Sequence, residues 1–143
     1  MVRDDRVTRV LLVVYLIGLV RVTLWPRIGA DDTFDLVRTV LAWLNSTGVP
    51  LSFSVTEFLA NIALFVPFGI LVGLLTRSPW WAVVGLGLAT SAVIELVQLL
   101  FLPDRVADLR DLLANTLGTA VGVGVLLAYR RRARRPSPVR VPA

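Results

Sequence analysis

The chain has 143 residues, a length that suits one domain, and 56% of them are apolar, whereas soluble domains have roughly 45–50%. It contains no cysteine and no histidine, which excludes a disulfide framework, zinc–thiolate sites and histidine general-base chemistry. All of its fifteen basic residues are arginine, and the largest cluster, between Arg130 and Arg135, directly follows an apolar segment. This placement predicts anchoring at the cytoplasmic face of a membrane and argues against a nucleic-acid partner.

The first apolar run, from about residue 7 to residue 25, is long enough to cross a bilayer as a helix. Arginines precede it, so a cleaved signal peptide is the alternative interpretation. Arg21 interrupts the run late, and Trp25–Pro26 does not resemble a small-residue cleavage site. We therefore expect a retained transmembrane helix in which Arg21 reaches outward or meets an acidic partner.

Residues 31–45 have a different pattern. Apolar side chains recur there at helical spacing, while Asp35, Arg38 and Thr39 fall on the other face. A helix of about fifteen residues is too short to span a bilayer. The segment predicts a short amphipathic helix in the extracytoplasmic interface, with Trp43 at the level of the headgroups.

Three further apolar runs follow, at about residues 55–75, 80–102 and 111–129. Only the segment from Thr76 to Pro79 separates the first two of these, so they must be antiparallel neighbours. Four spans in total place both termini on one side of the membrane. Most arginines fall on that side, so the positive-inside rule assigns both termini to the cytoplasm.

The predicted fold is all-α, a polytopic membrane helical bundle of four transmembrane helices with a short extracytoplasmic interfacial amphipathic helix. Residues 1–135 would form the transmembrane domain, and residues 136–143 a disordered cytoplasmic tail. The predicted location is the cell membrane, with multiple passes. The sequence leaves the oligomeric state open.

Polar side chains interrupt the apolar runs at positions that the predicted topology brings into one layer, in the outer leaflet. A carboxylate near mid-bilayer costs roughly 2.5–3.5 kcal/mol on insertion scales, so such residues mark a candidate site. Helical spacing directs the side chains inward from three spans. The candidate ligand-binding residues are Glu57, Asn61, Glu95, Gln98, Arg105, Asp108, Asp111 and Asn115. The candidates for a catalytic role are Glu95, Arg105, Asp108 and Asp111.

Each of these groups also has a structural interpretation. Glu95 and Gln98 can form interhelical hydrogen bonds that only fix the bundle. Acids such as Asp108 and Asp111 suit a helix N-terminus because of its dipole. The two asparagines are of a type that often joins packed helices in membranes.

Small residues predict close helix packing in the cytoplasmic half. Gly118 and Gly122 share one face of the last span, and Gly69 lies on the inward face of the second. Such glycines let neighbouring backbones approach closely. Pro67 predicts a kink and frees the carbonyl of Ala63 for another hydrogen bond.

Three sequence blocks, taken in order, carry a family resemblance. They are Asn61-Ile-Ala-Leu-Phe-Val-Pro67-Phe-Gly69, Glu95-Leu-Val-Gln98, and the spaced set Arg105, Asp108, Asp111, Asn115, Gly118 and Gly122. Their order and spacing resemble the VanZ-like family of small bacterial integral membrane proteins, over about residues 57–129. Ala107 stands where the family often has an aromatic residue, and Arg110 where it often has an acid.

The resemblance implies a protein of the bacterial cell envelope, in a family whose namesake is linked to teicoplanin resistance. The leading hypothesis is that the chain binds or modifies an amphipathic ligand, lipid-like or lipoglycopeptide, in an acidic outer-leaflet pocket. One alternative is a membrane enzyme that uses carboxylates or a divalent cation on lipid-linked phosphate or glycan. Another is a proton or cation transporter. Membrane lipids are the expected partners, no cofactor is identified apart from that divalent cation, and whether the protein is an enzyme stays open.

Overall fold

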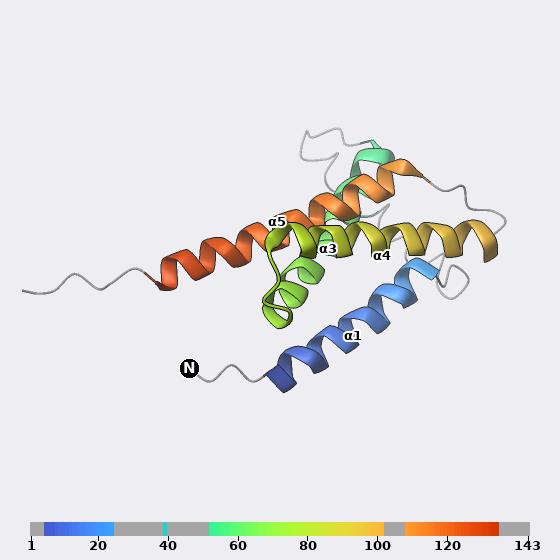
Figure 1. Cartoon of the computed structure of the whole chain (residues 1–143). Coiled ribbons are helices and arrows are strands. Elements are labelled where there is room, and N and C mark those ends of the chain that lie inside the picture. The colour runs from blue at the N-terminus through green and yellow to red at the C-terminus, as the bar shows by residue number, and fades with distance from the viewer. Residues whose placement is uncertain (1–4, 25–38, 40–51, 102–107, 135–143) are drawn as a thin grey trace, which may run out of the picture.

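The computed structural model describes residues 5–24, 39, 52–101 and 108–134, and the regular structure of these residues is helical (Figure 1). The helices are α1 (Asp5–Leu24), α3 (Phe53–Leu75), α4 (Trp80–Phe101) and α5 (Leu109–Ala133). They match the four predicted apolar runs to within about one turn at each end. The predicted interfacial helix at 31–45, apart from Thr39, and the tail at 136–143 lie outside the described residues.

Three of these helices are long and apolar enough to cross a membrane. They are Ser54–Leu75 within α3, Trp80–Phe101, and Leu109–Ala133. Apolar side chains on their outer faces are exposed, among them Val93, Leu96, Leu100, Leu113 and Val121. An apolar surface of this kind on three long helices is what a bilayer requires, so the protein is a helical membrane protein.

A short turn joins α3 to α4, and the two helices are in contact. The sequence predicts antiparallel neighbours, whereas α3 crosses α4 steeply (Figure 1). Thr76 ends α3, and its backbone N–H donates to the carbonyl of Val72 at 2.9 Å. Arg77 has a φ of 50°, in the left-handed region, which turns the chain. The carbonyl of Pro79 then accepts from the N–H of Ala82 at 3.0 Å, at the start of α4.

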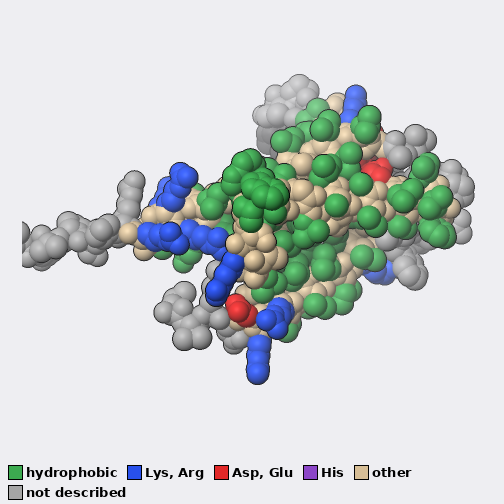
Figure 2. Space-filling model, viewed as in Figure 1, with side chains coloured by type: hydrophobic (Ala, Val, Ile, Leu, Met, Phe, Trp, Pro, Cys, Tyr) green, Lys and Arg blue, Asp and Glu red, His purple; other side chains and the backbone are tan. Residues whose placement is uncertain are grey.

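Successive helices run in alternating directions (Figure 1). The start of α1, the α3–α4 turn and the end of α5 lie toward one end of the molecule, which we call the arginine end because it carries Arg6, Arg9, Arg77 and Arg130 to Arg134. Figure 2 shows arginine side chains gathered there, beside a surface rich in hydrophobic side chains. The start of α3, the end of α4 and the start of α5 lie toward the opposite end.

Glycines hold α3 and α5 together, in the most extensive helix contact of the described residues. A Cβ atom placed on Gly69, Gly118 or Gly122 would collide with a backbone carbonyl of the facing helix. The carbonyls belong, in that order, to Thr119, Ile62 and Val66. Because lipid tails are as apolar as side chains, such close contact is what favours helix association in a bilayer. The predicted packing role of these glycines is therefore confirmed.

Helix α1 packs against α3 and α4. Its Leu19 is buried, and the hydroxyl of Tyr15 donates to the carbonyl of Leu64 on α3 at 2.9 Å. Leu64 lies three residues before Pro67, next to Ala63, whose carbonyl the proline leaves without its helical donor. The further hydrogen bond expected at Ala63 stays a prediction. The bond fastens α1 beside the proline of α3.

Candidate functional site

The end opposite the arginine end carries most of the predicted site residues. Helices α3 and α5 begin there and α4 ends there, so residues far apart in the sequence meet. We call the following set the polar layer: Asn61 from α3, Ser91, Glu95 and Gln98 from α4, and Asp108, Asp111 and Asn115 at the start of α5. Four hydrogen bonds that reach from one helix or its cap to another define its geometry.

The first bond joins α3 to α5. Nδ2 of Asn61 donates to Oδ1 of Asp111 at 2.7 Å, and both side chains are partly buried. Asp111 lies in the first turn of α5, where a carboxylate interacts favourably with the helix dipole. A hydrogen bond to a carboxylate is stronger than one between neutral groups. This pair therefore orients two predicted ligand-binding residues toward each other.

The second bond joins α4 to the beginning of α5. Asp108 is the N-cap of α5, and its Oδ1 accepts from the N–H of Arg110 at 2.8 Å. The N–H of Asp108 in turn donates to Oε2 of Glu95 at 3.1 Å. The capping interpretation of Asp108 is thus correct. At the same time the cap places Glu95 and Asp108 side by side.

The third bond lies one turn further into the bundle. Nδ2 of Asn115 donates to Oγ of Ser91 at 2.8 Å, and both residues are buried. The hydroxyl of Thr119, on the next turn of α5, donates to the backbone carbonyl of Asn115 at 3.0 Å. Oδ1 of Asn115 is buried and has no hydrogen-bond partner in the described part of the chain.

The fourth bond connects α4 to α1. Nε2 of Gln98 donates to the carbonyl of Thr23 at 2.9 Å, and Gln98 is buried. The last carbonyls of a helix have no partner within it, so Gln98 satisfies one of them at the end of α1. This contact fits the interpretation of Gln98 as a residue that fixes the bundle.

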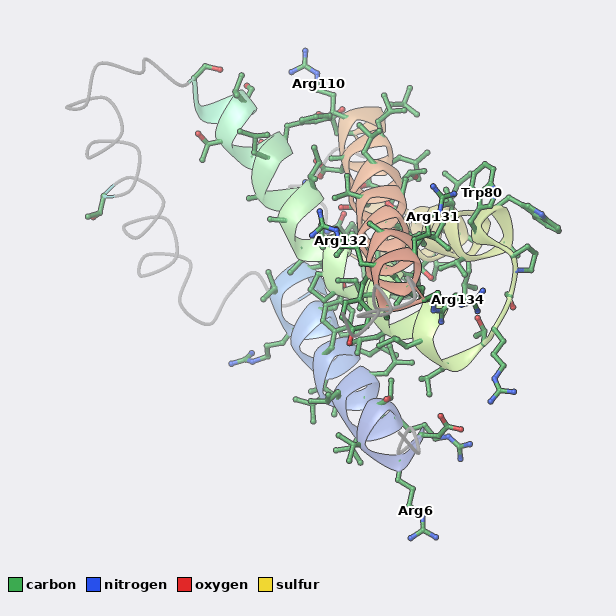
Figure 3. The ribbon with its side chains drawn as sticks, turned by 90° about the vertical axis from the view of Figure 1, so that its left-hand side faces the viewer. Arg6, Trp80, Arg110, Arg131, Arg132 and Arg134 are labelled. Atoms are coloured by element: carbon green, nitrogen blue, oxygen red, sulfur yellow. The ribbon has the colours of Figure 1, made fainter. Side chains whose placement is uncertain are left out.

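The remaining candidates are Glu57 and Arg105. Glu57 is exposed on α3, one turn before Asn61. Arg105 lies outside the described residues. Arg110 projects away from the helices, toward the surroundings (Figure 3).

The predicted site residues do not include Ser91, Thr23 or Thr119. Ser91 lies one turn before Glu95 on the same face of α4, so its spacing could have identified it as a site residue. Thr119 lies four residues after Asn115 and has the same spacing on α5. Thr23 contributes only its backbone carbonyl, which no side-chain pattern can indicate.

The polar layer contains three carboxylates, three amides and one hydroxyl, in a bundle that is mainly apolar. Within residues 5–24, 39, 52–101 and 108–134, no three acidic side chains come close enough together to hold a metal ion. The carboxylates are instead joined to amide groups, Asp111 to Asn61 and Glu95 to the backbone of Asp108. Such an arrangement can bind and orient a polar group.

A family model described as VanZ/LLP1 matches residues 12–130 of the chain. This range contains all of the polar layer and most of each of the four helices. Neither the curated proteins nor the solved structures include a match to the chain.

Proposed function

The chain belongs to the VanZ/LLP1 family, and from this membership we propose that it binds an amphipathic ligand, lipid-like or lipoglycopeptide, at the polar layer in the outer leaflet of the bacterial cell membrane. In this proposal α1 is a fourth span, residues 31–45 lie in the outer interface and both termini are cytoplasmic. The concentration of arginine at one end of the molecule supports that orientation (Figure 2).

One observation carries the proposal. Three apolar helices bring hydrogen-bonding side chains together at one end, and mutual bonds between Asn61 and Asp111 and between Glu95 and Asp108 hold them in place. Polar groups in membrane helices are expensive and tend to serve a function. A site whose side chains are already oriented loses less entropy when it binds a ligand.

The apolar surroundings favour a ligand with a tail. Leu96 and Leu99 on α4 and Leu113 on α5 lie within one turn of polar-layer residues, and more than half of each side chain's surface is exposed. A ligand with its polar head in the layer would place its acyl chain against these side chains, so none of its hydrocarbon would be exposed to water. Teicoplanin, which carries an acyl chain, is one molecule of this kind.

A crosslinking experiment tests the proposal. The full chain is placed in lipid nanodiscs with a phospholipid whose acyl chain carries a photoactivatable group near the headgroup, and crosslinked peptides are mapped. We expect crosslinks concentrated in residues 91–99 and 108–116. Asn61→Leu should reduce them about fivefold, whereas Arg110→Gln, on the outward face, should not. Crosslinks spread evenly along the apolar faces, and unchanged in Asn61→Leu, would contradict the proposal.

Antibiotic binding gives a separate test of ligand class. The same nanodiscs are titrated with teicoplanin and with a deacylated derivative of it. If the ligand is a lipoglycopeptide, the acylated compound should compete with the photoactivatable lipid and the deacylated one should not. Equal competition by the two compounds would show that the acyl chain has no part in recognition.

A further inference from the structure

The side-chain oxygen of Asn115 has no function in the fold as described. The residue is 5% exposed, and its Nδ2 donates to Ser91. Its Oδ1 is buried and has no partner in the described residues. A buried carbonyl oxygen without a hydrogen bond costs free energy, and in native proteins such groups are few and call for an explanation.

A partner for this oxygen cannot come from the arginine-end side of Asn115. One turn in that direction, Thr119 fills the space against α4 so tightly that a Cβ on Gly87 would collide with its hydroxyl. Gly118 lies equally close to the backbone of Ile62 on α3. These contacts close the bundle beneath Asn115.

The other side of Asn115 is polar. Asp111 lies one turn away on α5, and Glu95 lies one turn beyond Ser91 on α4. Both are only partly buried. A hydrogen-bond donor that reaches Oδ1 of Asn115 must therefore pass these two carboxylates, which themselves accept and do not donate when ionised.

We propose that Oδ1 of Asn115 forms the floor of the ligand site and accepts a hydrogen bond from an N–H or O–H group of the ligand's polar head. The inference rests on the proposed function and names the class of head: one that donates, such as an ammonium or a hydroxyl. One N–H of Asn115 Nδ2 is already bonded to Ser91, whereas Oδ1 has no bond in the described residues, so an acceptor is the group of Asn115 that a ligand would satisfy. A head that only accepts hydrogen bonds cannot satisfy Oδ1.

Matched pairs of lipids test this directly. Phosphatidylethanolamine donates from its ammonium group, and phosphatidylcholine has the same charge but no N–H. Phosphatidylglycerol donates from hydroxyls, and phosphatidylmethanol has the same charge but no hydroxyl. The full chain is released from nanodiscs that contain equal amounts of one pair with identical acyl chains, and retained lipid is measured by native mass spectrometry. We expect the donating member of at least one pair to be retained about fivefold more, which corresponds to roughly 1 kcal/mol.

Variants separate Asn115 from the rest of the bundle. Asn115→Leu should abolish the preference for the donating lipid, and Asn115→Asp, which retains an acceptor oxygen at this position, should preserve it. Thr116→Val is the matched control, because the hydroxyl of Thr116 bonds to the carbonyl of Leu112 within its own helix. It should leave the preference intact. Thermal unfolding of each variant shows whether the bundle is still formed.

The results distinguish this inference from the proposed function. Equal retention within both pairs by the unmodified chain would overturn the inference, and it requires no variant to fold. A donor preference that survives in folded Asn115→Leu would overturn it as well, since an acceptor other than Oδ1 of Asn115 would then be its source. In either case the crosslinks at the polar layer would be unchanged, and only their absence would contradict the proposed function.

Discussion

Asn61 and Asp111 are fifty residues apart in the sequence, yet Nδ2 of the first lies 2.7 Å from Oδ1 of the second. Their bond joins α3 and α5 at the polar layer, and Gly69, Gly118 and Gly122 join the same two helices further in. One helix pair is therefore held by polar contact at one end and by backbone contact along its length.

The bond between Asn61 and Asp111 should contribute measurably to stability. A double-mutant cycle with Asn61→Ala and Asp111→Ala should give a coupling free energy of about 0.6–1.7 kcal/mol, the range of interhelical hydrogen bonds in membranes. Unfolding in mixed micelles at increasing denaturing detergent measures it. The pair Asn61 and Thr116 serves as the control, since the hydroxyl of Thr116 bonds within α5, and its coupling should be near zero.

Alanine at Gly118 should destabilise the bundle. Its Cβ would collide with the backbone carbonyl of Ile62, which cannot move away as a flexible side chain can. Overpacking of this kind costs about 1–3 kcal/mol. Gly124→Ala, on the same helix with nothing within 4 Å of its Cβ, should be neutral or slightly stabilising in the same detergent titration. Equal effects of the two substitutions would refute the close contact of α3 and α5.

Removing the hydroxyl of Tyr15 should weaken the packing of α1 against α3. Tyr15→Phe deletes the 2.9 Å bond to Leu64 and should cost about 1 kcal/mol. The loss should appear as faster amide hydrogen exchange near the middle of α1 and around Pro67. Tyr129→Phe is the matched control, because 64% of the surface of Tyr129 is exposed. The same exchange rates in the two variants would argue that α1 is held by other contacts.

The proposed orientation can be tested with single cysteines, because the chain has none of its own. A membrane-impermeant maleimide added to intact cells should label Arg110→Cys. It should label Arg77→Cys or Arg134→Cys only after the membrane is opened. The opposite pattern would invert the topology. It would then place the polar layer in the inner leaflet.

Much of the fold was predictable because it depends on side chains whose type and spacing can be read in the sequence. Apolar runs mark the helices, and glycines at spacings of four mark the contact of α5 with α3. Helical faces also place Asn61 and Asp111 in one layer. The identity of the bonded pair was not predictable, since Glu57, Glu95 and Asp108 lie near the same end and any of them could have accepted from Asn61.

The contacts of α1 could not be predicted from the sequence, for a different reason. Gln98 donates to the carbonyl of Thr23, and Tyr15 donates to that of Leu64. Every residue has a backbone carbonyl, so the sequence does not show which one a side chain selects. Only the packing of α1 on α3 shows that Tyr15 reaches the carbonyl of Leu64.

The glycine contacts between α3 and α5 have a consequence for lateral entry from the bilayer. No side chain lies between the two backbones at Gly69, Gly118 and Gly122, so no change of rotamer can open a passage there. The contact of α4 with α5 involves the side chains of Ser91 and Asn115, and the contact of α1 with α3 involves that of Tyr15; such side chains can rotate. A molecule that approaches through the lipid therefore meets a rigid contact between α3 and α5, but side chains that can rotate at α4 and α1. Its route to the polar layer would run past α4 or α1.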